Sequence, residues 1–192
     1  MKHLQRAAIL VSLVRYLRQQ GSWCGETHLQ KATFFLQEAA HVPMSLPFVL
    51  YKHGPYSFEL HDQINTLLSN GALKLEPQPY PYGPSIIVTN RGEQLLQRFP
   101  KTLGRYEDPI QSVAKHLGNA GVLELERLAT ALYVVSSNPR ARIEELVEQL
   151  CGLKPHISGI DALEAVERVR ETLASLDGHF PREAAAAKHS ER

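Results

Sequence analysis

The chain has 192 residues, of which 43% are hydrophobic and 21% are charged, and its formal net charge is +1. This composition is that of a globular protein rather than a disordered or strongly basic one, and no apolar run approaches the ~18 residues that cross a bilayer. The apolar first segment is interrupted by Arg6 and Arg15, and no small-residue cleavage site follows it. We therefore expect an amphipathic helix of a cytoplasmic protein rather than a signal peptide.

The first half begins with two predicted helices. Apolar residues recur at helical spacing over 4–19, which indicates the first helix. A second helix is predicted from the capping-box pattern of Thr27 with Gln30, and Pro43 and Pro47 close it.

A strand, a turn and a third helix are predicted next. Residues 47–51 read as a strand, Gly54 and Pro55 predict a turn, and Ser57 is expected to cap the third helix. We interpret the segment 51–57, YKHGPYS, as a structural turn around which Tyr51 and Tyr56 pack, with Tyr51 at least partly in the core.

Two β-type runs then flank a loop that holds Tyr80 and Tyr82, which predicts a long-tipped hairpin, and Asn90 is expected to cap a short helix. Helices beside a small hairpin are the winged-helix plan. The expected fold is therefore mainly α, with a winged-helix-like domain over 1–104.

The second half is predicted to be wholly helical over 105–180, as a domain packed on the first. Proline dipeptides at Asp108-Pro109 and Asn138-Pro139 predict helix starts, and Ser158 with Asp161 predicts the last one. Residues 181–192 are expected to form a disordered tail. The apolar helices predicted at 123–135 and 162–176 could pack against a second copy of the chain, so a homodimer is one expectation.

The sequence contains no motif that indicates a catalytic site, a metal site or a cofactor site. Ser57 and His61 lie one helical turn apart, but the pattern matches no catalytic signature. Cys24 and His28 form a single loose pair, whereas a closed zinc site needs four ligands, and the chain has no glycine-rich phosphate motif. We expect a protein that is not an enzyme, with no metal and no cofactor.

Two binding functions remain open. The third helix carries Glu59 and Asp62 and no Lys or Arg, although base-reading helices favour Arg, Lys, Asn and Gln. Tyrosines near turns favour protein recognition, and the expected partner-binding residues are Lys52, His53, Tyr56, His61, Tyr80 and Tyr82.

The alternative is a DNA-binding transcriptional regulator, because residues 1–104 have 10 Lys or Arg against 6 Asp or Glu. Its expected phosphate contacts are Arg15, Arg18, Lys31, Lys52, Lys74 and Arg91.

Three segments together resemble the YwgA-like family of uncharacterised bacterial proteins. These are Leu29-Gln30-Lys31, the YKHGPYS segment 51–57 that contains Gly54 and Pro55, and Val88-Thr89-Asn90-Arg91-Gly92. The resemblance covers about residues 5–175, and the chain is more distantly similar to the SocA-like, or Panacea, antitoxin domain. It implies a winged-helix-like fold with added helices. It also implies a non-enzymatic role in binding a partner protein, such as a toxin or another component of a phage-defence or mobile-element locus.

Overall fold

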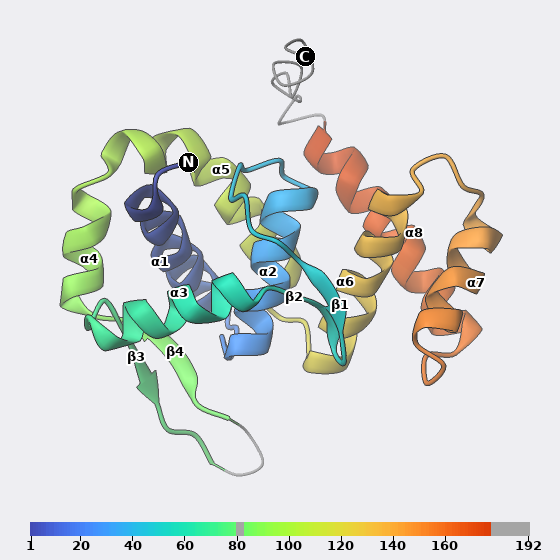
Figure 1. Cartoon of the computed structure of the whole chain (residues 1–192), viewed down its shortest axis with the longest axis horizontal. Coiled ribbons are helices and arrows are strands. Elements are labelled where there is room, and N and C mark those ends of the chain that lie inside the picture. Colours follow the sequence, from blue (N-terminus) through green and yellow to red (C-terminus); the bar gives the residue numbers. More distant parts are fainter. Residues whose placement is uncertain (80–82, 178–192) are drawn as a thin grey trace, which may run out of the picture.

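A computed structural model describes residues 1–79 and 83–177, and in these residues the chain forms eight helices and two antiparallel hairpins (Figure 1). The elements of the first half are α1 (His3–Gln19), α2 (Glu26–Glu38), β1 (Val49–Tyr51), β2 (Gly54–Tyr56), α3 (Phe58–Ser69), β3 (Leu73–Glu76), β4 (Ser85–Val88) and α4 (Asn90–Gln97). They are followed by α5 (Pro100–Leu117), α6 (Val122–Ser137), α7 (Ile143–Leu153) and α8 (Gly159–Asp177). The predicted mainly α fold with a small hairpin wing is confirmed.

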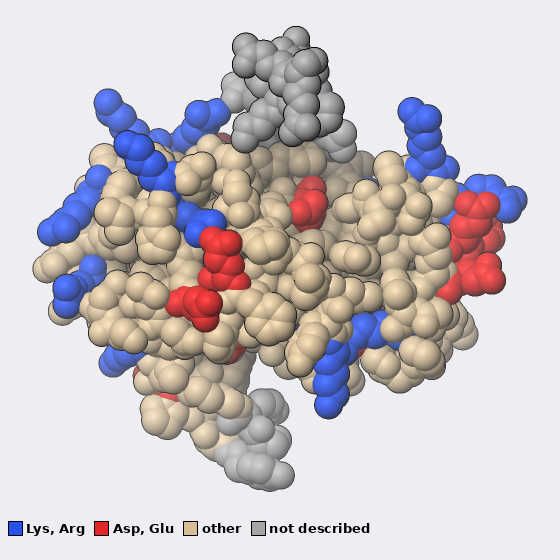
Figure 2. Space-filling model, in the orientation of Figure 1, with Lys and Arg blue, Asp and Glu red and all other residues tan. Residues whose placement is uncertain are grey.

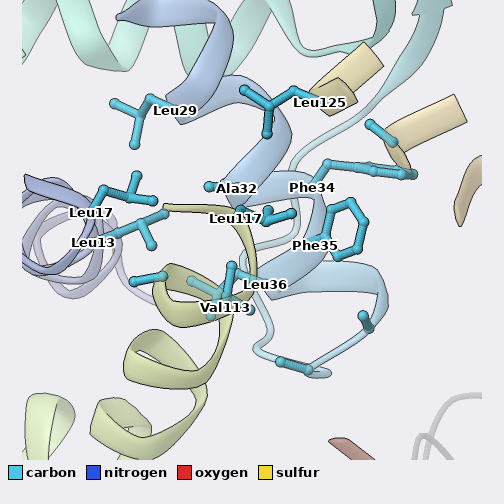
Figure 3. Close-up of a cluster of buried hydrophobic side chains, with 14 of the residues drawn as sticks. Leu13, Leu17, Leu29, Ala32, Phe34, Phe35, Leu36, Val113, Leu117 and Leu125 are labelled. Atoms are coloured by element: carbon cyan, nitrogen blue, oxygen red, sulfur yellow. The ribbon is translucent and has the colours of Figure 1, made fainter. Parts of the chain in front are cut away.

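The core is built around α2, which lies in the middle of the molecule (Figure 1). Helices α1 and α5 pack against each other and against α2, and α6 packs against α2 as well. Figure 3 shows leucines of α1, α2 and α5 filling the space between these helices, among them Leu13, Leu29 and Leu117. All three are at most 1% exposed. The apolar residues whose spacing predicts α1 and α2 are thus the residues buried between the helices.

The first hairpin replaces the predicted strand-to-helix turn. Strand β1 pairs with β2 in the register Val49↔Tyr56, Leu50↔Pro55 and Tyr51↔Gly54, so Lys52 and His53 form the connection. The predicted turn at Gly54-Pro55 was therefore wrong, because these residues belong to β2. A hairpin of two strands leaves outer edges unpaired, and a strand edge tolerates proline, which has no N–H to donate.

The second hairpin forms the wing. Strands β3 and β4 pair over the register from Leu73↔Val88 to Glu76↔Ser85, and the hairpin projects from the body of the protein (Figure 1). Helix α3 crosses in front of α2 and packs against both α2 and β3. The order of two helices, a third helix and a wing makes this half winged-helix-like.

Several predicted helix starts differ from the structure. Helix α2 is capped by Gly25 rather than by Thr27, and α4 is capped by Thr89, whose hydroxyl accepts a hydrogen bond from the Gly92 amide. Helix α7 begins at Ile143, after the Asn138-Pro139 dipeptide. The N-caps of α2 and α4 thus lie within two residues of the predicted ones, whereas α7 begins four residues later than predicted.

Helix α5 crosses the predicted boundary between the two halves. It begins at Pro100, where a proline fits the first turn, and it contains Pro109 in its interior. The expected helix start at Pro109 was therefore wrong, although that proline does remove one helical hydrogen bond. Residue 104, the predicted end of the first domain, lies inside α5, and one hydrophobic core includes residues of both halves.

Helices α6, α7 and α8 pack against one another. Leu125 and Leu132 of α6 and Val166 of α8 are at most 1% exposed, whereas Leu123 and Leu163 of the same two helices are 67% and 39% exposed. The homodimer therefore stays a prediction. None of the helices in the described ranges is long and apolar enough to cross a membrane.

We expect Gly54→Ala to lower the free energy of unfolding by about 1–3 kcal/mol. Gly54 has a φ of +87°, which L-residues rarely adopt, and an added Cβ would lie 3.2 Å from Thr130 Oγ1. Gly104→Ala is the matched control, because a Cβ there has no neighbour within 4 Å and alanine favours the α5 helix. Urea denaturation of both variants measures the difference, and equal midpoints would contradict this account of Gly54.

Candidate functional site

Large apolar and aromatic side chains form an exposed surface on the first hairpin and the start of α3. We call Val49, Tyr51, Tyr56 and Phe58 the aromatic surface. Tyr51 and Phe58 are each 58% exposed and Val49 is 47% exposed. The ring centroids of Tyr56 and Phe58 lie 5.1 Å apart, and those of Tyr51 and Phe58 lie 6.0 Å apart. The expectation that Tyr51 packs into the core was therefore wrong, because its ring lies on the outer side of the hairpin.

Helix α2 holds the inner side of this hairpin through two consecutive polar residues. The Gln30 side chain accepts a hydrogen bond from the Ser57 amide and donates one to the Ser57 carbonyl, both at 3.0 Å. Lys31 Nζ donates to the Pro55 carbonyl at 3.0 Å. Gln30 and Lys31 are 0% and 2% exposed. Thus Gln30, expected to act in a helix cap, instead joins α2 to the segment where β2 ends and α3 begins.

A second set of buried charges lies beneath the turn of the hairpin. Glu126 of α6 pairs with Lys154 at the end of α7, with 3.0 Å between Oε1 and Nζ. Both side chains are about 5% exposed. Lys154 Nζ also donates to the carbonyls of Tyr51, at 3.1 Å, and Lys52. The hairpin backbone is therefore bonded to α2 by Lys31 and to the second half of the chain by Lys154.

Two histidines lie over the outer side of Glu126. His53 Nδ1 is 3.6 Å from Glu126 Oε2, and His156 Nε2 is 3.5 Å from Glu126 Oε1. Their side chains are exposed, unlike the carboxylate between them. Within the described parts of the chain, no group of three or more His, Cys, Asp or Glu is arranged to hold a metal ion.

Glu26 organises the opposite edge of the aromatic surface. Its carboxylate accepts hydrogen bonds from the Tyr56 hydroxyl, at 3.2 Å, and is 2.7 Å from His61 Nδ1. Burial and the negative charge of Glu26 raise the pKa of Tyr56 to about 12, so this phenol stays protonated and acts as a donor at neutral pH. Asn65 contacts the other nitrogen of His61 at 2.9 Å.

The predicted partner-binding residues fall into two groups. Lys52, His53, Tyr56 and His61 all lie on the first hairpin or on α3 beside it, and each has at least part of its side chain accessible. Tyr80 and Tyr82, expected on the wing, lie outside the described residues. Tyr56 thus belongs to the aromatic surface, and Lys52, His53 and His61 lie on the same hairpin or on α3.

The predicted phosphate-contacting residues are more scattered. Lys31 is buried, which removes it from any surface patch. Arg15 pairs with Glu93 at 3.4 Å and Arg18 with Glu76 at 3.9 Å, whereas Lys52, Lys74 and Arg91 are exposed on different elements. Figure 2 shows Lys and Arg mainly around the periphery of this face, with wide uncharged areas between them.

Of the polar residues at the third helix, Gln63 and Ser57 are buried, whereas His61 and Asn65 are accessible. Gln63 is 3% exposed, so it faces the interior rather than a groove, and Glu59 pairs with Arg6 at 2.5 Å. The Ser57 hydroxyl is buried and accepts a hydrogen bond from the Leu60 amide as the N-cap of α3. Burial separates it from any substrate that would approach from solvent.

Sequence reasoning missed Phe58, Val49, Glu126 and Lys154. Phe58 follows the N-cap directly, a position that faces outward when the apolar stripe of α3 starts at Leu60, so the helical period could have indicated its exposure. Glu126 and Lys154 gave no local signal. They meet the hairpin from segments far along the chain, and Lys154 is 103 positions after Tyr51.

Comparison with known proteins finds no family model that matches the chain and no curated protein that matches it. The resemblance to the YwgA-like family accordingly stays a prediction from the three motifs. In this structure two of those motifs touch each other, because Gln30 and Lys31 of the first bond the backbone of Ser57 and Pro55 in the second.

Lys31 makes the stability of the protein depend on pH in the mildly alkaline range. Burial lowers its pKa from 10.5 to about 8, an effect that Lys154 reinforces and that the charges of Glu126 and Glu26 oppose. Between these two values the unfolded chain binds more protons than the folded one, so stability rises with pH. We expect a gain of about 1 kcal/mol from pH 8 to pH 9.

Lys31→Met is the variant that checks this expectation, because it removes the titrating group from a buried position and keeps a long side chain. Urea unfolding at pH 7.5, 8, 8.5 and 9 should give a free energy of unfolding that rises with pH by about 1 kcal/mol more in the natural sequence than in the variant. Measurements above pH 9 are less informative, because burial raises the pKa of Cys24 from 9.0 to about 12 and that group acts in the opposite direction. The same slope in both proteins would assign the effect to another residue.

Proposed function

We propose that the chain is a non-enzymatic binding protein whose aromatic surface holds a partner protein. The observation that carries this proposal is the exposure of Tyr51 and Phe58, each 58%, side by side at the same edge of the fold. Aromatic rings are the side chains that most often dominate binding energy at protein interfaces. Single exposed apolar residues are ordinary, whereas two exposed rings in contact with Tyr56 and next to Val49 make a continuous patch.

The support beneath the patch favours recognition without rearrangement. The backbone of the hairpin is bonded from below by Gln30, Lys31 and Lys154. A surface that is already ordered before it meets its partner loses less conformational entropy on binding. The ionisable groups near the hairpin thus have a structural task, which is a reason to assign binding rather than chemistry to this edge.

The charges around the patch suit a protein better than DNA. The neighbouring helix α3 presents Glu59 and Asp62 and has no Lys or Arg, and carboxylates repel the phosphates of a duplex. Figure 2 shows acidic side chains near the middle of this face and a further group of them at its right edge. DNA binding through Arg15, Arg18, Lys52, Lys74 and Arg91 remains the alternative, without Lys31. If the resemblance to antitoxins holds, the partner is a toxin or another protein of a defence locus in the cytoplasm.

We expect the variant that combines Tyr51→Ala with Phe58→Ala to lose partner binding by more than about 30-fold. The partner is first identified by a photo-crosslinking amino acid placed at Lys52, which is exposed beside the patch. Binding is then measured by calorimetry with the purified partner. The matched control combines Leu123→Ala with Ile160→Ala, which truncates two apolar residues that are 67% and 83% exposed elsewhere and should leave the affinity unchanged.

Two results would count against the proposal. One is a partner that binds the double variant as tightly as the natural sequence. The other is micromolar binding of a generic labelled duplex that weakens steeply as salt rises, since that dependence reports contacts to phosphates. The second result would favour the DNA-binding alternative.

A further inference from the structure

A small pocket lies between α2, the loop at 41–48 and α6, away from the charges beneath the hairpin. Its volume is about 240 Å³, below the ~300–1,000 Å³ of sites for drug-sized ligands. The side chains of Phe34, Phe48 and Tyr133 line it together with Glu38, Gln37 and Ser136. It is therefore sized for a head group or a single side chain rather than for a large molecule.

Three aromatic rings from three different segments meet at this pocket. Phe34 belongs to α2, Phe48 to the loop and Tyr133 to α6. Phe34 and Phe48 pack edge to face with 5.0 Å between their centroids. Phe34 is almost fully buried, but Phe48 and Tyr133 are half-buried, which leaves parts of both rings open to a ligand.

The charge of the pocket has one sign. Glu38 is the single ionisable residue apart from the Tyr133 phenol among the residues that line it, and none of them is Lys, Arg or His. Gln37 Nε2 donates a hydrogen bond to Glu38 Oε1 at 2.8 Å, which holds the carboxylate in place. The pocket therefore offers aromatic π-systems and one negative charge.

The loop wall is fixed before any ligand arrives. Gln37 Oε1 accepts a hydrogen bond from the Leu46 amide at 2.8 Å, and Gln37 Nε2 donates to the Leu46 carbonyl at 3.1 Å. The same loop contains His41 and Ser45 with φ of 54° and 56°. Left-handed backbone at two residues that are not glycine is costly, and such strain is kept where the rest of the structure imposes it.

We propose that this pocket binds a methylated ammonium group. Aromatic rings attract cations through the negative potential of their faces, and quaternary ammonium groups, which are bulky and weakly hydrated, are recognised in this way. The Glu38 carboxylate adds a charge attraction, and the rings contact the methyl groups. The inference is independent of the partner-binding proposal, because it uses none of the residues of the aromatic surface.

A second pocket differs from this one in its charges. It lies between α6 and α8, and both of its arginines are paired, Arg127 with Asp161 at 2.7 Å and Arg168 with Glu124. A cation entering there would have to displace an arginine. The residues that line the Glu38 pocket include no arginine that a cation would have to displace.

Choline and its neutral isostere 3,3-dimethyl-1-butanol provide the test, because they have nearly the same shape and differ in charge. Each is titrated into the full chain at millimolar concentrations while the ring resonances of Tyr133 and Phe48 are followed by NMR. We expect saturable shifts with choline and an affinity at least about fivefold weaker for the alcohol. N-acetyl-trimethyllysine methylamide, titrated in parallel, distinguishes a peptide-borne group from a free one by which of the two cations binds more tightly.

Glu38→Gln should remove most of the preference for choline over the alcohol, since it deletes the charge and keeps the shape. Glu124→Gln is the matched control in the other pocket and should leave the preference unchanged. Equal affinity of the natural sequence for choline and the alcohol would overturn the proposal and indicate a merely apolar pocket. The absence of saturable shifts at Tyr133 and Phe48 with both cations would overturn it as well.

Discussion

The position of the first hairpin depends on two buried ammonium groups. The strand β1 has an exposed, half-buried and exposed residue in sequence, so apolar burial alone fixes it weakly. Lys31 and Lys154 instead donate to carbonyls at Pro55, Tyr51 and Lys52, on both strands and the turn between them. Removing water from two ammonium groups is costly. The carboxylate of Glu126, 3.0 Å from Lys154, offsets part of that cost.

This arrangement joins the two halves of the chain more firmly than their core contacts do alone. A buried ion pair contributes little stability over a well-packed apolar pair, but losing one partner costs about 3–5 kcal/mol because the other charge stays buried. Glu126 and Lys154 come from α6 and the end of α7, and the carbonyls that Lys154 binds belong to the first half. Undocking α7 from the hairpin would therefore leave Glu126 and two carbonyls without their donor. The winged-helix-like half and the helical half behave as one unit at this junction.

The sequence predicted those features whose cause is local. Helical periodicity identified α1, α3 and α6, and the hydroxyl of Ser57 caps α3 where an N-cap pattern was visible. Proline gave a misleading signal at Pro109, because its fixed φ suits both a first turn and a tolerated interior position, and only the packing of α5 against α1 decides between them. Gln30 misled for a similar reason. Its spacing from Thr27 suits a capping box, but its side chain instead makes two hydrogen bonds, one to the amide and one to the carbonyl of Ser57.

The candidate site was predictable only in outline, because its support is assembled from distant segments. YKHGPYS drew attention as a dense group of polar and aromatic residues, yet which of them face outward depends on the hairpin register. That register places Tyr51 opposite Gly54, and the missing side chain of Gly54 lets the strand approach α6, with Thr130 Oγ1 only 3.2 Å from where a Cβ would be. Because the backbone at Gly54 lies close to α6 on the inner side of the hairpin, the large ring of Tyr51 lies on the outer side. The same glycine that brings the hairpin within reach of Lys31 thus leaves Tyr51 exposed, and the burial of Lys31 and the exposure of the Tyr51 ring have one geometric origin.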